Sequence, residues 1–319
     1  MSEAQKPEGL TRDEEAAVAL LNALDAAGYS FTTVTPETHR RVVARASMRE
    51  AKDLRGVFGW SLPFREEVVP PHIFDLLKRA RLLRQTAAGW KATVRVSCVH
   101  GLLFMHSAFP TVAEDSVFLG PDTVRFVDFI LAELGPEPRA RRLVDIGAGA
   151  GVGGIITARA LGSAAVELVD INDTALSQAR INAAHAGAAV RTYHSDGVDA
   201  VAPGFDLAIA NPPFIIDEDG PTYRAGGGMH GAELSRDWTL AAAEKLAPGG
   251  RVLLYTGSSI VDGQDALRAS LEDALPALDC TLRYRELDPD IFGEELEGAP
   301  YADVERIAAI GAVVEKHAD

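Results

Sequence analysis

The chain has 319 residues, of which 47% are hydrophobic and 24% charged, and its net charge at pH 7 is −15. This balance is typical of a soluble globular protein and excludes collagen-like, coiled-coil and largely disordered chains. No apolar run approaches the roughly 20 residues of a membrane helix, and the polar start of the chain lacks the apolar segment of a signal peptide. The two cysteines, Cys98 and Cys280, have no metal-ligand spacing, so we expect reduced thiols, no metal and a cytoplasmic protein.

The charge is unevenly distributed along the chain. Residues 1–140 have a net charge of −1, and residues 141–319 have a net charge of −14. Within the first part, residues 39–95 hold thirteen basic and five acidic side chains, a net charge of +8. Such a basic region can bind RNA or another polyanionic partner on one face. Charged helix faces exposed to solvent are the alternative explanation of the same pattern.

The first part of the chain predicts three helices followed by a hairpin. Apolar residues at helical spacing predict helices over residues 13–27, over residues 36–54 and from residue 71 onward. Alternating residues predict strands over residues 90–98 and 102–107, with a turn at His100-Gly101. This order indicates a small α+β domain over residues 1–110, similar to a winged helix, that recognises the substrate or caps the other domain.

From residue 141 the chain alternates between strands and helices, which predicts a parallel sheet covered by helices on both faces. The expected strands are 143–146, 165–169, 189–193, 206–210, 251–256, 280–287 and 306–314. The expected helices are 152–161, 173–186, 232–246 and 265–275. Only a loop separates the last two strands, so one of them is expected to be antiparallel. We therefore predict an α/β domain over residues 111–319.

A glycine-rich loop connects the first of these strands to the first helix. Glycine allows a positive φ and a close approach of a ligand to the backbone, and the helix N-terminus then faces that ligand. Two cofactors fit the loop. The dinucleotide pattern G-x-G-x-x-G matches Gly149, Gly151 and Gly154. The S-adenosylmethionine (SAM) pattern D-x-G-x-G-x-G matches Asp145, Gly147, Gly149 and Gly151.

Two aspartates follow the next two strands. Asp170 can accept hydrogen bonds from both ribose hydroxyls of either cofactor, so it does not discriminate between them. Asp196 can accept a hydrogen bond from an adenine amino group, and a simple loop or cap aspartate is the alternative.

The segment Asn211-Pro212-Pro213-Phe214 follows the fourth strand and favours SAM. The prolines fix the backbone and remove two N–H donors, so the local carbonyls face outward as acceptors. The Asn211 side-chain oxygen and the Pro212 carbonyl can together accept both hydrogens of a planar amino group. Phe214 can offer a flat surface for stacking a base or an amide. N-methylation calls for such an arrangement, whereas hydride transfer does not.

With this motif the sequence resembles the class I SAM-dependent methyltransferases of the N/D-P-P-F/Y type. They include release-factor glutamine methyltransferases and the "methyltransferase small" rRNA and tRNA N-methyltransferases. Residues 170–182 are similar to the family's D-x-x-x-x-A-L-x-x-A-x-x-N helix, and residues 246–250 to its L-x-P-G-G turn. Residues 118–123 resemble the segment that lies over the cofactor, without its basic residue. The resemblance implies a Rossmann-like sheet of seven strands, the last one antiparallel, with SAM across the strand C-termini.

We expect three groups of site residues. The catalytic residues are Asn211, Pro212 and Phe214. The cofactor-binding residues are Asp145, Gly147, Ala148, Gly149, Gly151, Asp170, Ile171, Asp196, Gly197 and Asn211. The substrate-contacting residues are Pro213, Tyr223 and His230. Tyr223 and His230 belong to a glycine-rich segment that is expected to form a mobile lid, although a helix-start partner is the alternative role of His230.

The expected function is SAM-dependent N-methylation of a macromolecule, at an RNA base or a protein glutamine. A small-molecule N-methyltransferase is the alternative within the same chemistry. A winged-helix regulator that only senses SAM is a third hypothesis, and the intact amino-group motif argues against it. The basic region favours RNA, whereas residues 170–182 and the acidic second half of the chain favour a protein amide.

Overall fold

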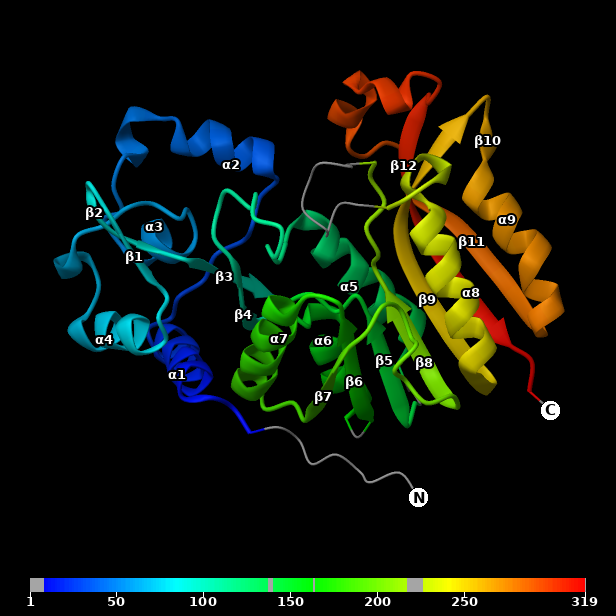
Figure 1. The fold of residues 1–319 in the computed structure, drawn as a ribbon, viewed down its shortest axis with the longest axis horizontal. Coiled ribbons are helices and arrows are strands. Elements are labelled where there is room, and N and C mark those ends of the chain that lie inside the picture. Colours follow the sequence, from blue (N-terminus) through cyan, green and yellow to red (C-terminus); the bar gives the residue numbers. More distant parts are fainter. Residues whose placement is uncertain (1–8, 137–139, 163, 217–225, 319) are drawn as a thin grey trace.

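The structure is a computed structural model that describes residues 9–136, 140–162, 164–216 and 226–318 (Figure 1). The chain forms two lobes that lie side by side, which we call the N-lobe (residues 9–110) and the sheet lobe (residues 111–318). The N-lobe and the two faces of the sheet bury separate clusters of apolar side chains. Among the described residues, none of the helices has both the length and the apolar character to cross a bilayer.

The N-lobe consists of four helices and two antiparallel hairpins. The helices are α1 (Arg12–Ala26), α2 (Pro36–Val43), α3 (Leu54–Phe58) and α4 (Pro71–Arg79), with short 3₁₀ turns η1 (Ala46–Met48) and η2 (Glu66–Val68). One hairpin pairs β1 (Leu83–Thr86) with β2 (Gly89–Ala92). The other pairs β3 (Val94–Val99) with β4 (Leu102–Ser107).

Two predictions for the N-lobe are wrong. The helix expected over residues 36–54 ends at Val43, because Arg45 has an extended backbone with φ −68° and ψ 142°. The strand expected over residues 90–98 is two strands, because the chain bends at Thr93, whose N–H donates to the carbonyl of Leu82. The first hairpin, β1–β2, was therefore missed. The likeness to a winged helix stays a prediction.

The sheet lobe follows the predicted alternation. Its strands are β5 (Arg142–Ile146), β6 (Ala165–Asp170), β7 (Val190–His194), β8 (Phe205–Ala210), β9 (Leu246–Val261), β10 (Gln264–Asp265), β11 (Cys280–Asp288) and β12 (Arg306–Lys316). Its helices are α5 (Pro121–Leu134), α6 (Val152–Leu161), α7 (Asp173–Ala186), α8 (Glu233–Lys245) and α9 (Ala266–Ala274), with 3₁₀ turns η4 (Met229–Gly231), η5 (Leu275–Leu278), η6 (Gly293–Glu297) and η7 (Ala299–Tyr301). The predicted elements are confirmed to within two residues at each end, except that β9 extends five residues further at both ends. Helix α5 was not predicted.

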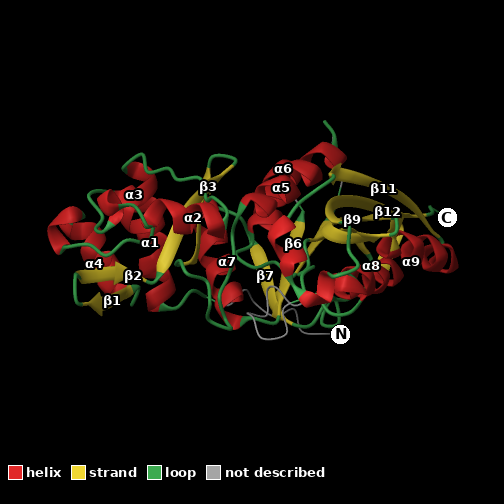
Figure 2. Ribbon diagram, turned by 90° about the horizontal axis from the view of Figure 1, so that it is seen from above, coloured by secondary structure: helices red, strands yellow, loops and turns green. Residues whose placement is uncertain are grey.

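The sheet has the strand order β11-β12-β9-β8-β5-β6-β7, and the two-residue strand β10 pairs with β9. The pairs from β9 through β8, β5 and β6 to β7 are parallel. Strand β12 runs antiparallel to both of its neighbours, β9 and β11. The predicted α/β class with a Rossmann-like sheet and an antiparallel last strand is therefore confirmed. Helices α5, α6 and α7 cover one face of the sheet, and α8 and α9 cover the other (Figure 2).

The two lobes meet along α7, where buried polar side chains join them. Asn182, which is fully buried, accepts a hydrogen bond from the Met105 N–H (2.7 Å) and donates to the carbonyls of Met105 and Ala150 (both 2.9 Å). Glu14 on α1 accepts hydrogen bonds from Ser177 Oγ and Arg180 Nη2, both 2.8 Å long. Asn182 thus connects the β3–β4 hairpin, α7 and the glycine-rich loop of the sheet lobe.

Candidate functional site

The carboxyl ends of three neighbouring strands form one edge of the sheet. The register pairs Ile146 of β5 with Val169 of β6 and with Ala210 of β8. The next residue of each strand therefore lies at the same edge, about 5 Å from its neighbour. In strand order these residues are Asp170, Gly147 and Asn211. Three residues predicted for the site from separate motifs are thus brought together.

The glycine-rich loop needs its glycines for conformation and for space. Gly147, Gly149 and Gly151 have φ values of +67°, +54° and +77°, which side chains rarely adopt. A Cβ at Gly147 would also lie 2.6 Å from the ring of Trp238. A Cβ at Gly149 would meet only a methyl group of Val117 within 4 Å among the described residues, at 3.9 Å. The loop is therefore most open at Gly149, where a ligand can approach the backbone.

Asp145 lies behind this loop and does not face the edge of the sheet. Only 2% of its surface is exposed, and its Oδ2 accepts a hydrogen bond of 2.7 Å from the N–H of Gly154 in the first turn of α6. Burial raises the pKa of Asp145 to about 7. The sequence predicted a direct contact with the cofactor, whereas the structure places the carboxylate where it holds the loop against α6.

Asp170 is partly exposed at the edge. Its Oδ2 accepts a hydrogen bond from the N–H of Gly149 (2.8 Å), and its Oδ1 accepts one from the N–H of Asn172 (2.9 Å). Burial raises the pKa of Asp170, and these N–H donors act in the opposite direction. Each oxygen keeps further lone-pair capacity, so the carboxylate can still accept hydrogen bonds from two hydroxyl groups.

The surroundings of Asp170 fit a nucleoside. Ile171 is 45% exposed, which is unusual for a large apolar residue in this chain, and it follows the carboxylate directly. Asp196, on the loop after β7, is exposed, and its carboxylate forms no hydrogen bond or ion pair with any described residue, although its backbone carbonyl accepts from Ser195 Oγ. An adenosine group can use an apolar surface against its ring, an acceptor for its ribose hydroxyls and an acceptor for its amino group. Ile171, Asp170 and Asp196 offer these three.

Trp238 of α8 packs against two of the predicted cofactor loops and was not predicted from the sequence. A Cβ at Gly197, which has a φ of +53°, would lie 3.3 Å from the pyrrole edge of this indole. The other edge of the same indole lies against Gly147. The side chain therefore spans the loops after β5 and β7. The only signal in the sequence is the pair of glycines, because a helical tryptophan 41 residues after Gly197 has no local pattern that connects it to them.

In the Asn211-Pro212-Pro213-Phe214 motif, the side chain of Asn211 is partly exposed, whereas the ring of Phe214 is packed in the core. Asn211 and Pro213 are partly exposed, and the Asn211 amide forms no hydrogen bond with a described residue. Phe214 is only 9% exposed, and its ring meets that of Phe292 edge-on at a centroid distance of 5.4 Å. A Cβ at Gly257 of β9 would clash with the same ring. The structure thus places Phe214 in the core, instead of at the surface that the expected stacking role requires.

Of the two residues predicted for the lid, the structure describes only His230. Tyr223 lies outside the described residues. His230 belongs to η4, and its Nε2 lies 3.0 Å from Asp303 Oδ1 in the C-terminal part of the chain. His230 therefore has a partner within the protein, which lies between η7 and β12 and not at a helix start, and its contact with substrate stays a prediction. The backbone of this segment is anchored where the Gly226 N–H donates to the carbonyl of Ile215 (2.8 Å).

Comparison with known proteins gives matches to the sheet lobe. Residues 126–274 match the family model described as Methyltransferase small domain. Ribosomal RNA small subunit methyltransferase C of Hahella chejuensis is 35% identical over 125 residues, which are 39% of this chain and 34% of the relative. Release factor glutamine methyltransferase of Koribacter versatilis is 30% identical over 155 residues, 44% of this chain and 55% of the relative.

A third relative is the tRNA1(Val) (adenine(37)-N6)-methyltransferase of Aeromonas hydrophila, 30% identical over 149 residues, which are 42% of this chain and 58% of the relative. The chain thus spans between a third and three fifths of the length of these curated relatives. The family match runs from α5 to α9 and includes the glycine-rich loop, Asp170 and Asn211. The resemblance predicted from the sequence is therefore confirmed for the sheet lobe.

Proposed function

We propose that this chain, whose residues 126–274 match the Methyltransferase small domain, is a SAM-dependent N-methyltransferase acting on a planar amino or amide nitrogen of a macromolecule. The main support is the position of Asn211, which follows β8 beside Gly147 of the glycine-rich loop. Its side-chain amide has no hydrogen bond to a described residue, so it is available for a substrate. The relatives, named as rRNA, tRNA and release-factor methyltransferases, support a macromolecular acceptor.

The cofactor is held by residues of the three loops at the sheet edge. Asp170 accepts hydrogen bonds from the ribose hydroxyls, and Ile171 covers one face of the adenine. Asp196 accepts a hydrogen bond from the adenine amino group, and the open backbone at Gly149 lies against the remainder of the molecule. When bound, SAM supplies an electrophilic methyl group on a positively charged sulfur.

The acceptor nitrogen is oriented by two oxygen atoms of the Asn-Pro-Pro-Phe motif. The Asn211 side-chain oxygen and the Pro212 carbonyl accept the two N–H groups, which leaves the nitrogen lone pair directed toward the cofactor. Accepting these hydrogen bonds also stabilises the positive charge that develops on the nitrogen. No general base is required, because the proton can leave after the transfer. Catalysis then comes from positioning and electrostatics.

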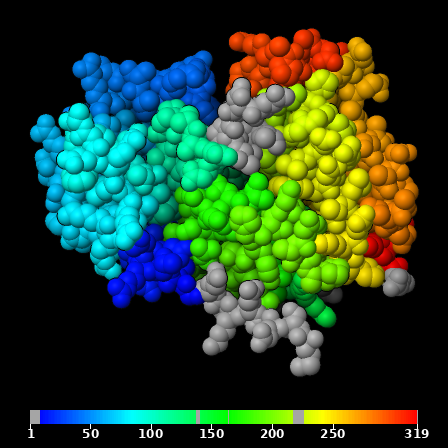
Figure 3. All heavy atoms as spheres, in the orientation of Figure 1, coloured from blue at the N-terminus to red at the C-terminus, as the bar shows by residue number. Residues whose placement is uncertain are grey.

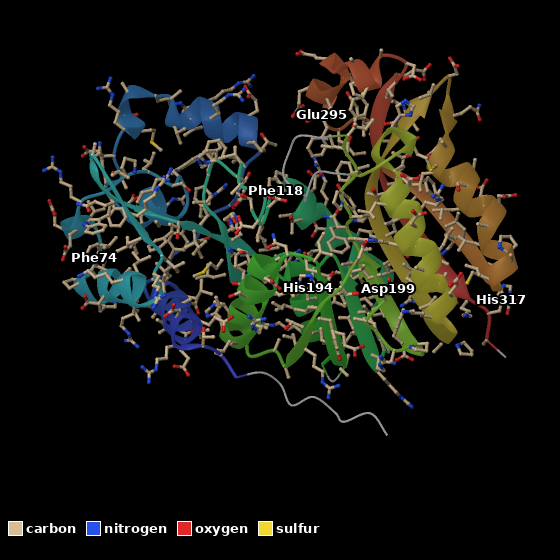
Figure 4. The ribbon with its side chains drawn as sticks, in the orientation of Figure 1. Phe74, Phe118, His194, Asp199, Glu295 and His317 are labelled. Carbon is tan, nitrogen blue, oxygen red and sulfur yellow. The ribbon has the colours of Figure 1, made fainter. Side chains whose placement is uncertain are left out.

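Two substitutions separate acceptor positioning from cofactor binding. Asn211→Ala is expected to keep the affinity for SAM and to lower turnover by about 10²-fold, the scale of losing one orienting polar contact. Asp170→Ala is expected to weaken SAM binding first. Asp199→Ala, an exposed carboxylate on the same loop as Asp196 and labelled in Figure 4, is the matched control and should change neither property. Loss of SAM binding in Asn211→Ala would contradict its role toward the acceptor.

The acceptor class is tested with methyl-labelled SAM and a lysate of the source organism that lacks this gene. The labelled product is divided and treated with RNase or with protease before counting. Label that either enzyme releases would support a macromolecular acceptor and name its class. Label found only in the low-mass fraction before treatment would contradict the proposal and support the small-molecule alternative.

A further inference from the structure

A cluster of basic side chains, three of them buried and one half-buried, lies in the N-lobe and includes none of the predicted site residues. We call it the Arg95 cluster, and it consists of Arg95 of β3, His106 of β4, His39 of α2 and Lys91 of β2. Arg95 and His106 are directly opposite each other in the β3–β4 hairpin, so their side chains share one face. Arg95 is 4% exposed, and Lys91 is half-buried.

The polar atoms of this cluster are incompletely bonded. Nη2 of Arg95 donates to Thr33 Oγ1 at 3.3 Å, but its buried Nε has no hydrogen-bond partner. The buried Nδ1 atoms of His39 and His106 also have no partner. Buried polar groups are almost always bonded, so these unpartnered nitrogens require an explanation. Nε2 of His39 donates to the Trp60 carbonyl, so its Nδ1 is an acceptor, and the unpaired donor that an anion can use is the Nε–H of Arg95.

The charge of the cluster is not balanced within the protein. No described carboxylate forms an ion pair with Arg95 or Lys91. Burial lowers the pKa of Arg95 to about 10, so this side chain remains cationic at pH 7. Burial and then the charge of Arg95 lower the pKa of His39 to about 4, so His39 is neutral. A buried cation without a counter-charge is costly to the folded protein unless a ligand supplies the anion.

Aromatic rings lie beside these basic side chains. The His39 ring stacks on Phe109 at a centroid distance of 4.1 Å and lies 5.2 Å from the ring of Trp60. The guanidinium of Arg95 lies 5.9 Å from the centroid of Phe31. Lys91 Nζ donates to the carbonyl of Phe109 at 3.1 Å, and both residues are partly exposed. The partly exposed pair marks the side from which a ligand can reach Arg95.

The Arg95 cluster is close to the proposed cofactor edge. Ser107, the residue after His106, accepts a hydrogen bond from the Val117 N–H through its Oγ (2.8 Å), and its own N–H donates to the Val117 carbonyl (3.1 Å). Val117 is the residue whose methyl group a Cβ at Gly149 would meet. In the space-filling view, the segment after β4 lies between α2 and the sheet lobe (Figure 3), and Phe118 lies between the two lobes in Figure 4. A macromolecule at the sheet edge can therefore also reach the cluster.

We propose that the Arg95 cluster binds a phosphate group of an RNA substrate, with the neighbouring aromatic rings contacting its bases. The assignment of this RNA as the substrate rests on the proposed methyltransferase function, whereas its binding does not. A guanidinium and an ammonium next to partly exposed aromatic rings, here Trp60 and Phe109, are a combination that suits single-stranded nucleic acid. Arg45 and Arg49, on the exposed segment after α2, form no ion pair with a described residue and extend the positive charge outward. An acidic peptide would use the cations but not the rings.

The test is direct binding of a fluorescein-labelled single-stranded RNA to the full chain, measured by anisotropy without SAM at several salt concentrations. Arg95→Met removes the charge and keeps an apolar chain of similar length. It is expected to lower RNA affinity by about tenfold or more and to reduce the salt slope by about one. Arg79→Met, on α4 at the far side of the N-lobe from α2 (Figure 1), is the matched control and should change affinity less than about twofold.

Thermal unfolding provides the second measurement. The midpoint of Arg95→Met without ligand should equal or exceed that of the wild type, because an unpaired buried charge has been removed. RNA should raise the wild-type midpoint more than that of the variant. If Arg95→Met does not fold, Lys91→Met takes its place, since Lys91 is only half-buried.

Several outcomes would overturn this assignment. One is a folded variant that binds RNA as the wild type does. Another is competition by an acidic peptide but not by unlabelled RNA, which would indicate a protein substrate. A third is loss of SAM affinity with RNA binding intact, which would place the cluster in the cofactor site. RNA binding that depends on Arg95 in a protein that methylates no macromolecule would refute the proposed function and leave the phosphate site standing.

Discussion

The N-lobe has two groups of buried polar side chains, and they differ in how completely they are bonded. Where the N-lobe meets α7, Asn182 and Glu14 have partners within the protein for each of their buried polar atoms, and Oε1 of Gln178 is the one buried side-chain atom of the described α7 residues without a partner. In the Arg95 cluster, three buried nitrogens have none. Both groups are similarly remote from solvent, so burial alone does not distinguish them. Complete bonding is what a group that fixes the fold requires, whereas the Arg95 cluster combines missing bonds with a buried cation that no described carboxylate balances.

The comparison predicts the largest loss of stability for Asn182→Ala. The substitution removes three buried hydrogen bonds and leaves the N–H and C=O of Met105 and the C=O of Ala150 without them. We expect the free energy of unfolding, measured by urea denaturation, to fall by about 3–5 kcal/mol. Asn22→Ala, which removes an exposed hydrogen bond to His185 between the same lobes, should cost less than about 1 kcal/mol. Equal losses of unfolding free energy in the two variants would contradict the special role of the buried Asn182 hydrogen bonds.

A smaller loss is expected for Glu14→Gln. Burial raises the pKa of Glu14, but hydrogen bonds from Thr11, Ser177 and Arg180 outweigh it, and the pKa lies below its ordinary value. The variant should lose about 1–3 kcal/mol at pH 7, because the partly buried charge pair with Arg180 is broken. Glu15→Gln, on the exposed side of α1, is the control and should stay within about 0.5 kcal/mol.

The pH dependence of the same variant has a defined sign. A carboxylate with a lowered folded-state pKa stabilises the protein above its unfolded-state pKa, and this stability is lost as the pH falls through the folded-state value. The wild type should therefore lose more stability than Glu14→Gln below about pH 4.5. Urea unfolding at pH 7 and at pH 3.5 would measure the difference, and parallel losses would show that the charge of Glu14 contributes nothing.

The smallest effect at pH 7 is expected for His39→Phe in the Arg95 cluster. The variant keeps a ring to stack on Phe109 and removes an unpartnered nitrogen, although it also loses the hydrogen bond with the Trp60 carbonyl. The free energy of unfolding should change by less than about 1 kcal/mol. A loss of unfolding free energy as large as that of Asn182→Ala would mean that His39 stabilises the fold as much as Asn182 does.

The pH dependence of stability separates the wild type from His39→Phe more clearly. His39 has an ordinary pKa of 6.5 that burial and Arg95 lower to about 4 in the folded protein. Between these two values the unfolded chain binds more protons, so the wild type loses stability as the pH falls from 6.5 to 4. His39→Phe should lose less over this range, measured as the unfolding midpoint at pH 7 and pH 4.5. Identical losses would contradict the lowered pKa.

The sequence predicted the sheet lobe well because its signals are local. Strands that alternate with helices, the glycine-rich loop and the Asn-Pro-Pro-Phe motif each occupy a short stretch of chain, and parallel strands bring their carboxyl ends to one edge. The predicted adjacency of Gly147, Asp170 and Asn211 follows from that geometry alone. The bonding partners of Asn182, by contrast, are 77 and 32 residues away in the sequence, and no local pattern encodes them.

Burial explains the remaining differences. Asp145 and Phe214 have side chains suited to a ligand, but the chain uses them to hold the glycine-rich loop and to fill the core. Which side of a loop a residue faces depends on what packs behind it, and a single sequence does not reveal this. In the N-lobe the short hairpin β1–β2 lacks a strong alternating pattern, so its pairing depends on the tertiary fold.

The antiparallel strand β12 also has a consequence for synthesis of the protein. It pairs with β9 along Arg306–Glu315 and with β11 on its other side, so it is an interior strand of the sheet although it is made after all the others. Until residues 306–316 have left the ribosome, β9 and β11 each present unpaired backbone groups to solvent. Such open edges can associate with other chains. A nascent form of this protein therefore depends on rapid completion, or on a chaperone, more than one whose last strand is added at the outside.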